Sequence, residues 1–314
     1  NTTASNNTGI GTYSLTANTT GASNTAVGRN ALTANTTASN NIAVGNDALK
    51  ENTTGTGNVA VGYNSLDANT TANYNTAVGY NTLSANVTGA SNAAFGYNTL
   101  AVNTASSNTA MGWGSLEANT TGASNTAVGS SALDSNTTAS NNTAVGHQAL
   151  TANTTGTGNT SVGKDSGRSI TTGNYNTSMG LDSLESTTTA ADNTAIGYYS
   201  LQANTTGANN VGLGRNTVAT NTTGNYNTGI GNYALALNTT ASSNTAVGYV
   251  SMYANTTGTQ NVAMGYGSLD ANTTASNNTA IGYNSMTANT TGIDNTGLGA
   301  NTLKTNTTGD YNTA

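Results

Sequence analysis

The chain has 314 residues, of which 6% are charged, and its formal net charge is −6. Its six lysines and arginines are scattered and form no basic stripe that could neutralise phosphates, so nucleic acid is not an expected partner. The absence of cysteine excludes disulfides and thiolate metal sites, and no apolar run approaches the roughly 18 residues of a membrane span.

One short motif, Asn-Thr-Ala-Val-Gly, is first intact at 24–28 and returns along the whole chain. Successive motif glycines are 17 residues apart, except for one interval of 16 residues between Gly96 and Gly112. A fixed short period is typical of a solenoid, in which each coil buries its apolar face by stacking on its neighbours. The sequence therefore predicts an all-β parallel β-solenoid, or β-roll, of 17-residue coils.

We expect residues 1–314 to form a single tandem-repeat domain of about 18 coils. At about 4.8 Å per coil, such a domain would be a rod on the order of 85 Å long. The first and last repeats are incomplete, and no segment of different composition closes either end. Because solenoids need caps over their terminal edges, the chain is expected to be a fragment of a longer protein.

Residues 24–40 serve as the template coil. The Val27 position holds only large apolar residues, and the Thr25 position holds mostly threonine or valine. Both are therefore expected to point inward from a first strand at 25–27.

A second strand is expected at 32–34, with Leu32 and Ala34 on its inner face and Thr33 outside. The stretches between the strands are rich in Gly, Asn and Ser, which are turn residues. The 16-residue interval lacks one residue between Leu100 and Asn108, so we expect the deletion to lie in the second bend and to leave the strands in register.

Two positions of the template coil are nearly constant. Asn24 recurs in every repeat and is expected to form a structural ladder of stacked amides. The Ala26 position accepts only Ala, Gly or Ser, although the assumed strand orientation points it outward. Such a small face indicates close approach by another backbone, either a sibling chain or the opposite wall of a thin coil. We favour the sibling chain, and the candidate chain–chain packing residues are Ala26, Gly28, Ala43, Gly45, Ala77 and Gly79.

The unit Asn-Thr-Ala-Ile-Gly-Tyr-Asn-Ser-Met at 278–286 resembles the Ala-Ile-Gly-centred head repeats of trimeric autotransporter adhesins. It is even more similar to the repeat shafts of phage tail-fibre-like proteins. The resemblance covers 7–314, although the 17-residue repeat is longer than the usual adhesin head repeat. It implies a left-handed β-roll, a homotrimer along one axis and a place on a cell or virion surface.

Catalytic patterns are weak, so we expect no enzyme activity, no metal and no cofactor. The one histidine, His147, occupies an outward position without triad partners. Most acidic residues stand singly, and Asp165 and Asp182, one period apart, are interpreted as a tolerated surface pair.

An outward aromatic row is the best candidate for surface contact. Aromatic rings with polar tips suit a cell-surface glycan or protein, whereas the alternative is ring stacking that only stabilises the sheet. The candidate contact residues are Tyr63, Tyr80, Tyr97, Trp113, Tyr198, Tyr249, Tyr266 and Tyr283.

Asn-x-Thr sequons recur once in most coils and are candidate glycosylation sites. Glycans on every coil would crowd at about 4.8 Å spacing, so a structural Asn/Thr ladder is the favoured interpretation, with Thr-linked glycosylation left open. The candidate asparagines are Asn18, Asn35, Asn52, Asn69, Asn86, Asn119, Asn136, Asn153, Asn204, Asn221, Asn238, Asn255, Asn272, Asn289 and Asn306.

The predicted function is an extracellular structural or adhesive rod that displays repeated weak contacts, so that avidity exceeds any single contact. The alternative is a self-assembling extracellular filament subunit, with or without glycosylation. Ice binding is a minor alternative, because Thr36 and Thr37 are adjacent in the chain and the Thr25 row is expected to be buried.

Overall fold

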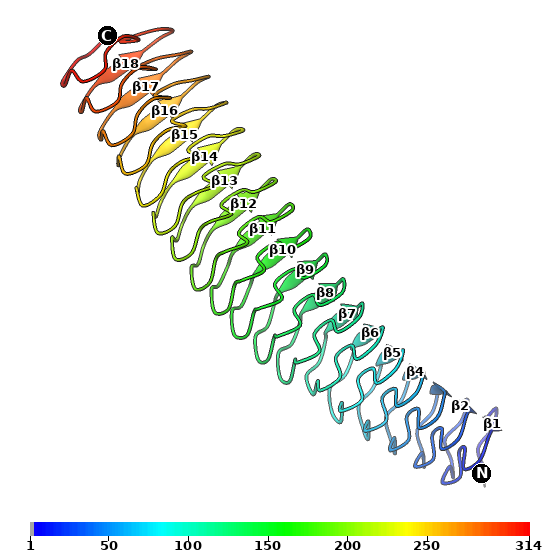
Figure 1. Ribbon diagram of the computed structural model, residues 1–314. Coiled ribbons are helices and arrows are strands. Elements are labelled where there is room, and N and C mark those ends of the chain that lie inside the picture. The colour runs from blue at the N-terminus through cyan, green and yellow to red at the C-terminus, as the bar shows by residue number, and fades with distance from the viewer. Residues whose placement is uncertain (1–2) are drawn as a thin grey trace. The chain divides into compact units, whose positions relative to one another are not determined.

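The computed structural model describes residues 3–314 and divides into two compact units, Asn1–Thr157 and Gly158–Ala314. Each unit is a parallel β-solenoid (Figure 1), as the repeat period predicts, and the part of the chain described contains no helix, hence none that could cross a membrane. The first unit contains nine strands: β1 (Thr8–Ile10), β2 (Thr25–Val27), β3 (Ile42–Val44), β4 (Val59–Val61), β5 (Thr76–Val78), β6 (Ala93–Phe95), β7 (Thr109–Met111), β8 (Thr126–Val128) and β9 (Thr143–Val145). The second contains nine more: β10 (Thr160–Val162), β11 (Thr177–Met179), β12 (Thr194–Ile196), β13 (Val211–Leu213), β14 (Thr228–Ile230), β15 (Thr245–Val247), β16 (Val262–Met264), β17 (Thr279–Ile281) and β18 (Thr296–Leu298).

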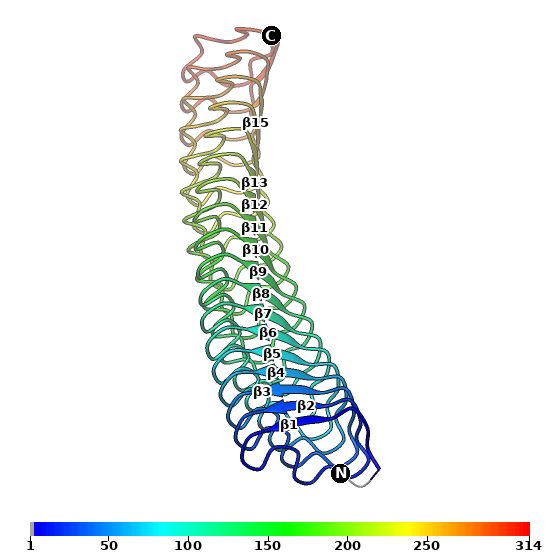
Figure 2. The same ribbon diagram turned by 90° about the vertical axis from the view of Figure 1, so that its right-hand side faces the viewer.

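Within each unit, every strand pairs in parallel with the equivalent strand of the next coil (Figure 2). The register joins equivalent positions, as between Ala26 and Ala43. The register is also kept across the 16-residue interval, where Ala93 of β6 pairs with Thr109 of β7. The deletion therefore lies outside the strand, as expected, because a bend can lose a residue without turning a strand over.

The orientation expected for the strand is wrong. The middle residue, Ala26, is completely buried, whereas Thr25 and Val27 on either side are partly exposed. The coil is too thin to hold a large side chain on both walls. Only Ala, Gly or Ser fits at the strand centre, so the β-branched and large apolar residues face outward.

The second strand is also absent. Residues 29–34 form turns, in which Asn30 has a φ of 56° and Leu32 a φ of 51°. Leu32 is buried as expected, but its buried neighbour is Ala31, and Ala34 is only half-buried. Backbone bonds still join this segment to the next coil, since Leu32 N–H donates to the Ala48 carbonyl at 3.1 Å and Ala34 N–H to the Lys50 carbonyl at 3.0 Å. These bonds hold a leucine in the left-handed region, which L-residues with branched side chains seldom adopt.

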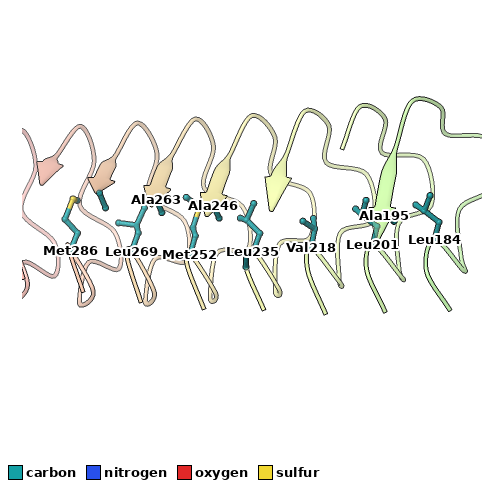
Figure 3. Close-up of a cluster of buried hydrophobic side chains, with 12 residues drawn as sticks. Leu184, Ala195, Leu201, Val218, Leu235, Ala246, Met252, Ala263, Leu269 and Met286 are labelled. Atoms are coloured by element: carbon teal, nitrogen blue, oxygen red, sulfur yellow. The ribbon is translucent and has the colours of Figure 1, made fainter. Parts of the chain in front are cut away.

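The apolar core of each coil is a contact between the two walls. Figure 3 shows it in the second unit, where Leu184, Leu201, Val218 and Leu235 follow one another opposite the strand row that includes Ala195 and Ala246. A Cβ added at Gly9, an equivalent of Ala26 in the first unit, would meet Ser14 Oγ at 3.3 Å, and one at Gly229, an equivalent in the second unit, would meet Val218 of the preceding coil at 2.7 Å. The small strand residue is therefore required by the opposite wall of the same chain.

This finding corrects the candidate chain–chain packing residues. Ala26, Ala43 and Ala77 are fully buried inside the single chain and offer no surface to a sibling. Gly28, Gly45 and Gly79 have φ between 137° and 140°, and a Cβ on Gly28 or Gly45 would overlap the carbonyl group of the motif glycine in the next coil. The backbone that approaches so closely belongs to the same chain.

Candidate functional site

The first of two buried amide ladders runs through the constant Asn24 position. The backbone N–H of Asn41 donates to Oδ1 of Asn24 at 2.9 Å, and Nδ2 of Asn41 donates to the Gly55 carbonyl at 2.8 Å. The same pair of bonds recurs from coil to coil, and the side chains from Asn24 to Asn142 in the first unit are buried. The predicted structural role of this asparagine is confirmed.

The second amide ladder is formed by the sequon asparagines. Nδ2 of Asn52 donates to Oδ1 of Asn35 at 3.1 Å and to the Gly55 carbonyl at 3.0 Å, while Oδ1 of Asn52 accepts from Nδ2 of Asn69 at 2.8 Å. The Gly55 carbonyl thus accepts from both ladders and joins them. Since each buried amide needs a partner, the two ladders satisfy each other within a core that has little apolar volume.

This burial corrects the candidate glycosylation sites. An N-linked glycan must be attached to Nδ2, but in the folded coil that atom is a buried donor with one partner in the adjacent coil and one in its own bend. The buried candidates are Asn18, Asn35, Asn52, Asn69, Asn86, Asn119, Asn136, Asn153, Asn204, Asn221, Asn238, Asn255, Asn272 and Asn289, and Asn306 is partly buried.

The second threonine of the same bend is accessible instead. It is exposed in both units, whereas the hydroxyl of the first threonine is used between coils, as where Thr53 Oγ1 donates to the Thr70 carbonyl at 3.1 Å. A Thr-linked modification would therefore not disturb either amide ladder. The exposed threonines are Thr20, Thr37, Thr54, Thr71, Thr88, Thr121, Thr138 and Thr155 in the first unit and Thr172, Thr189, Thr206, Thr223, Thr240, Thr257, Thr274, Thr291 and Thr308 in the second.

The short coil leaves a defect in the second amide ladder. Asn103 Nδ2 reaches the Ala105 carbonyl at 2.8 Å, two residues on rather than the usual three, and Oδ1 of Asn86 is buried without a hydrogen-bond partner. The ladder resumes immediately, because Nδ2 of Asn119 donates to Oδ1 of Asn103 at 2.7 Å. The missing residue is therefore absorbed within one bend.

The aromatic row of the first unit forms a stacked column. Ring centroids are 5.1 Å apart between Tyr63 and Tyr80, 5.2 Å between Tyr80 and Tyr97, and 6.5 Å between Tyr97 and Trp113. All four rings are nearly parallel to their neighbours and exposed. The ring stacking that was considered as the alternative to ligand contact is thus present. It leaves the ring edges and the tyrosine hydroxyls available to a ligand.

In the second unit Tyr249, Tyr266 and Tyr283 form a similar column, with centroids 5.5 Å and 5.4 Å apart. Tyr233 meets the first of these rings edge-on at 6.4 Å. A shallow hollow of about 400 Å³ is lined by Tyr233, Tyr249, Val250 and Tyr253.

Earlier in the second unit, the Tyr198 and Tyr199 rings lie 3.9 Å apart, and the Arg215 guanidinium lies 5.7 Å from the Tyr198 ring centroid. The Arg215 guanidinium also lies 5.8 Å from the Tyr233 ring centroid. This geometry places a cation over two aromatic faces.

The outer face of each sheet carries a surface that the sequence reasoning missed. Because the strand orientation is reversed, the Val27 position forms an outward row that is aliphatic in every strand except β6, which has Phe95 there; Ile10 and Met111 are exposed in the first unit and Ile196 and Leu298 in the second. The signal that could have revealed it is the restriction of the Ala26 position to the smallest residues. The Thr25 row lies on the same outer face, so its expected burial no longer argues against ice binding. The strands still lack the Thr-x-Thr pair that would place two hydroxyls on one face.

His147 is exposed as expected, and residues 3–314 contain no group of three His, Cys, Asp or Glu side chains placed to hold a metal ion. Asp165 is buried with Oδ2 3.0 Å from Lys164 Nζ, and burial together with the charges of Glu185 and Asp165 raises the pKa of Asp182.

Comparisons with protein-family models, with curated proteins and with solved structures found no match for this chain. The adhesin and tail-fibre resemblance therefore stays a prediction.

Replacing Asn52 by alanine tests the second amide ladder. The change removes both donors to Asn35 and Gly55 and the acceptor for Asn69. Leaving such buried groups unpaired should lower the free energy of unfolding by about 1–3 kcal/mol, measured by urea denaturation. Thr54→Ala, at an exposed position of the same bend, should change it by less than about 0.5 kcal/mol; equal effects of the two changes would contradict a structural ladder.

Partial burial raises the pKa of Asp270 above its ordinary 3.8. Because the pKa is higher in the folded state than in the unfolded state, the carboxyl group contributes stability below the unfolded pKa of about 3.8. That contribution is lost as the pH rises through the pKa of Asp270 in the folded state. Asp270→Asn should therefore raise the melting temperature at pH 7 and leave it unchanged at pH 3. Asp192→Asn, at an exposed bend, is the control; a stability gain of equal size at both pH values would contradict the assignment.

Proposed function

We propose that this protein is an extracellular structural rod that presents repeated aromatic contacts to a glycan or protein on a cell or virion surface. The supporting observation is that successive coils hold the exposed rings of Tyr63, Tyr80, Tyr97 and Trp113 in one stacked column. A column of this kind offers several equivalent weak contacts at a fixed spacing.

Two features of the coil suit such a role. The amide ladders occupy the interior, so the outward side chains vary without disturbing the fold. The rigid register holds neighbouring contacts one coil apart, and simultaneous engagement of several contacts raises the effective affinity. The composition, with 6% charged residues, favours recognition through apolar faces and hydroxyls over charge pairing.

Binding of the whole chain to an array of immobilised glycans and to intact cells tests this proposal. Tyr80→Ala removes the central ring of the column and should weaken binding at least about tenfold if avidity depends on adjacent rings. Tyr74→Ala is the matched control, because Tyr74 is 68% exposed but packs on Gly57 and not on a ring. Equal binding by the two variants would reject the column as the contact surface.

A second candidate function, a self-assembling filament subunit, is favoured by the outward aliphatic row. Apolar rows of this length on soluble proteins mark association surfaces, and a second copy, or the three copies of a trimer, would match the row because it has the same repeat. The exposed threonine row would remain available for glycans.

Light scattering of purified chain across a range of concentrations tests assembly. Val78→Lys, on the outward row of β5, should abolish concentration-dependent association, while Thr37→Ala should leave it unchanged. A wild-type chain that stays monomeric throughout the range would reject the filament, and an intact mass of 31.1 kDa would exclude attached glycans.

A further inference from the structure

Two sets of tyrosines, here called the tyrosine ladders, hold phenol rings face to face on successive coils. The first consists of Tyr63, Tyr80 and Tyr97, with interplanar angles of 14° and 8° at centroid distances of 5.1 Å and 5.2 Å. The second consists of Tyr249, Tyr266 and Tyr283, with angles of 21° at 5.5 Å and 5.4 Å. Every ring of both ladders is exposed, so a solvent-borne oxidant reaches them.

The backbone fixes the separation of these rings. Asn81 N–H donates to the Tyr63 carbonyl and Asn98 N–H to the Tyr80 carbonyl, both at 3.0 Å. In the second ladder, Gly267 N–H donates to the Tyr249 carbonyl at 3.1 Å. Since these bonds belong to the coil-to-coil register, neighbouring rings cannot separate without local opening of the solenoid, and their effective concentration is high.

We propose that the tyrosine ladders are sites of oxidative cross-linking, in which a haem peroxidase with hydrogen peroxide joins neighbouring rings as dityrosine. Each of two phenols loses one electron and one proton to give a phenoxyl radical. The radicals couple through the ring carbons ortho to the phenol oxygens, and the hydrogen on each coupled carbon then moves as a proton to the oxygen of the same ring, which restores both phenols and both aromatic rings. The peroxide accepts the two electrons and two protons and becomes two molecules of water, so the chain loses two hydrogen atoms for each carbon–carbon bond formed.

The cross-link would join two successive coils covalently. The coils of a solenoid are held to their neighbours by hydrogen bonds and side-chain packing, and this chain has no cysteine to form a disulfide between them. A dityrosine between Tyr63 and Tyr80 would close a loop of one repeat and limit separation of the coils in the unfolded state, as a disulfide does. This inference does not depend on the ligand proposed for the aromatic column.

Ring geometry, and not exposure, is what distinguishes the ladders from other tyrosines. Tyr74 and Tyr175 are more exposed, at 68% and 65%. Each lies over a glycine of the preceding coil, since a Cβ on Gly57 would be 2.9 Å from Tyr74 Cδ1 and one on Gly158 would be 2.7 Å from Tyr175 Cδ1. Coupling governed by exposure would therefore favour Tyr74 and Tyr175 over the ladder rings, and coupling governed by stacking would favour the ladders.

The test treats dilute whole chain with horseradish peroxidase and hydrogen peroxide and measures dityrosine by its fluorescence and by amino-acid analysis after hydrolysis. Each ring couples once, so each ladder yields at most one cross-link, and the Tyr198–Tyr199 pair at 3.9 Å supplies a third. Tyr80→Phe combined with Tyr266→Phe keeps the stacking but removes the central phenols. The remaining ladder tyrosines are then two coils, about 9.6 Å, apart.

The double ladder variant should give about one third of the wild-type dityrosine where only stacked rings couple, because Tyr198–Tyr199 is then its one remaining stacked pair, and about one half where the edge-on contacts of Tyr233 with Tyr249 and Tyr253 also couple. Tyr74→Phe combined with Tyr175→Phe removes the same number of tyrosines and should retain the full yield. Wild-type product should be monomeric, lighter by two hydrogen atoms per cross-link, with peptides containing Tyr63 and Tyr80 joined. Equal yields from the two double variants, or dityrosine found only in covalent oligomers, would overturn the proposal.

Discussion

The structure depends on pairing buried amides between equivalent positions of successive coils. A coil of 17 residues is too thin to enclose a large apolar core, and its interior contains Asn24-type and Asn35-type side chains in almost every repeat. Such groups are costly to bury without partners. Parallel in-register stacking supplies those partners, because the donor of one asparagine faces the acceptor of its copy one coil away.

The same thinness determines the size of the remaining interior side chains. The strand contributes Ala26 and the opposite wall contributes Leu32, so one small and one large residue fill the space between them. Close stacking also restricts the motif glycines, since any Cβ there would overlap the backbone of the next coil. The interior is therefore nearly fixed in composition, whereas the outer face accepts threonine, valine, isoleucine or methionine.

The outward rows give the surface its chemistry. A side chain at any outward position recurs one coil away in the same orientation, so a single tyrosine becomes a column when neighbouring repeats also carry one. Stacking stabilises the column, and this does not compete with surface recognition, which uses the edges and hydroxyls. The sequence located the aromatic column and the Asn24 ladder, but a stretch of alternating small and large residues could not tell which set faced solvent.

The 17-residue period by itself determined the solenoid, the parallel register, the Asn24 ladder and the position of the deletion before Asn108, because all of these follow from equivalent residues meeting one period apart. Only the tertiary structure decided the orientation of the strand, the left-handed backbone of Leu32 and the burial of the sequon asparagines. Side-chain alternation is unchanged when the two faces are exchanged. The choice between them came from the distance to the opposite wall, which brings together residues such as Gly9 and Leu15.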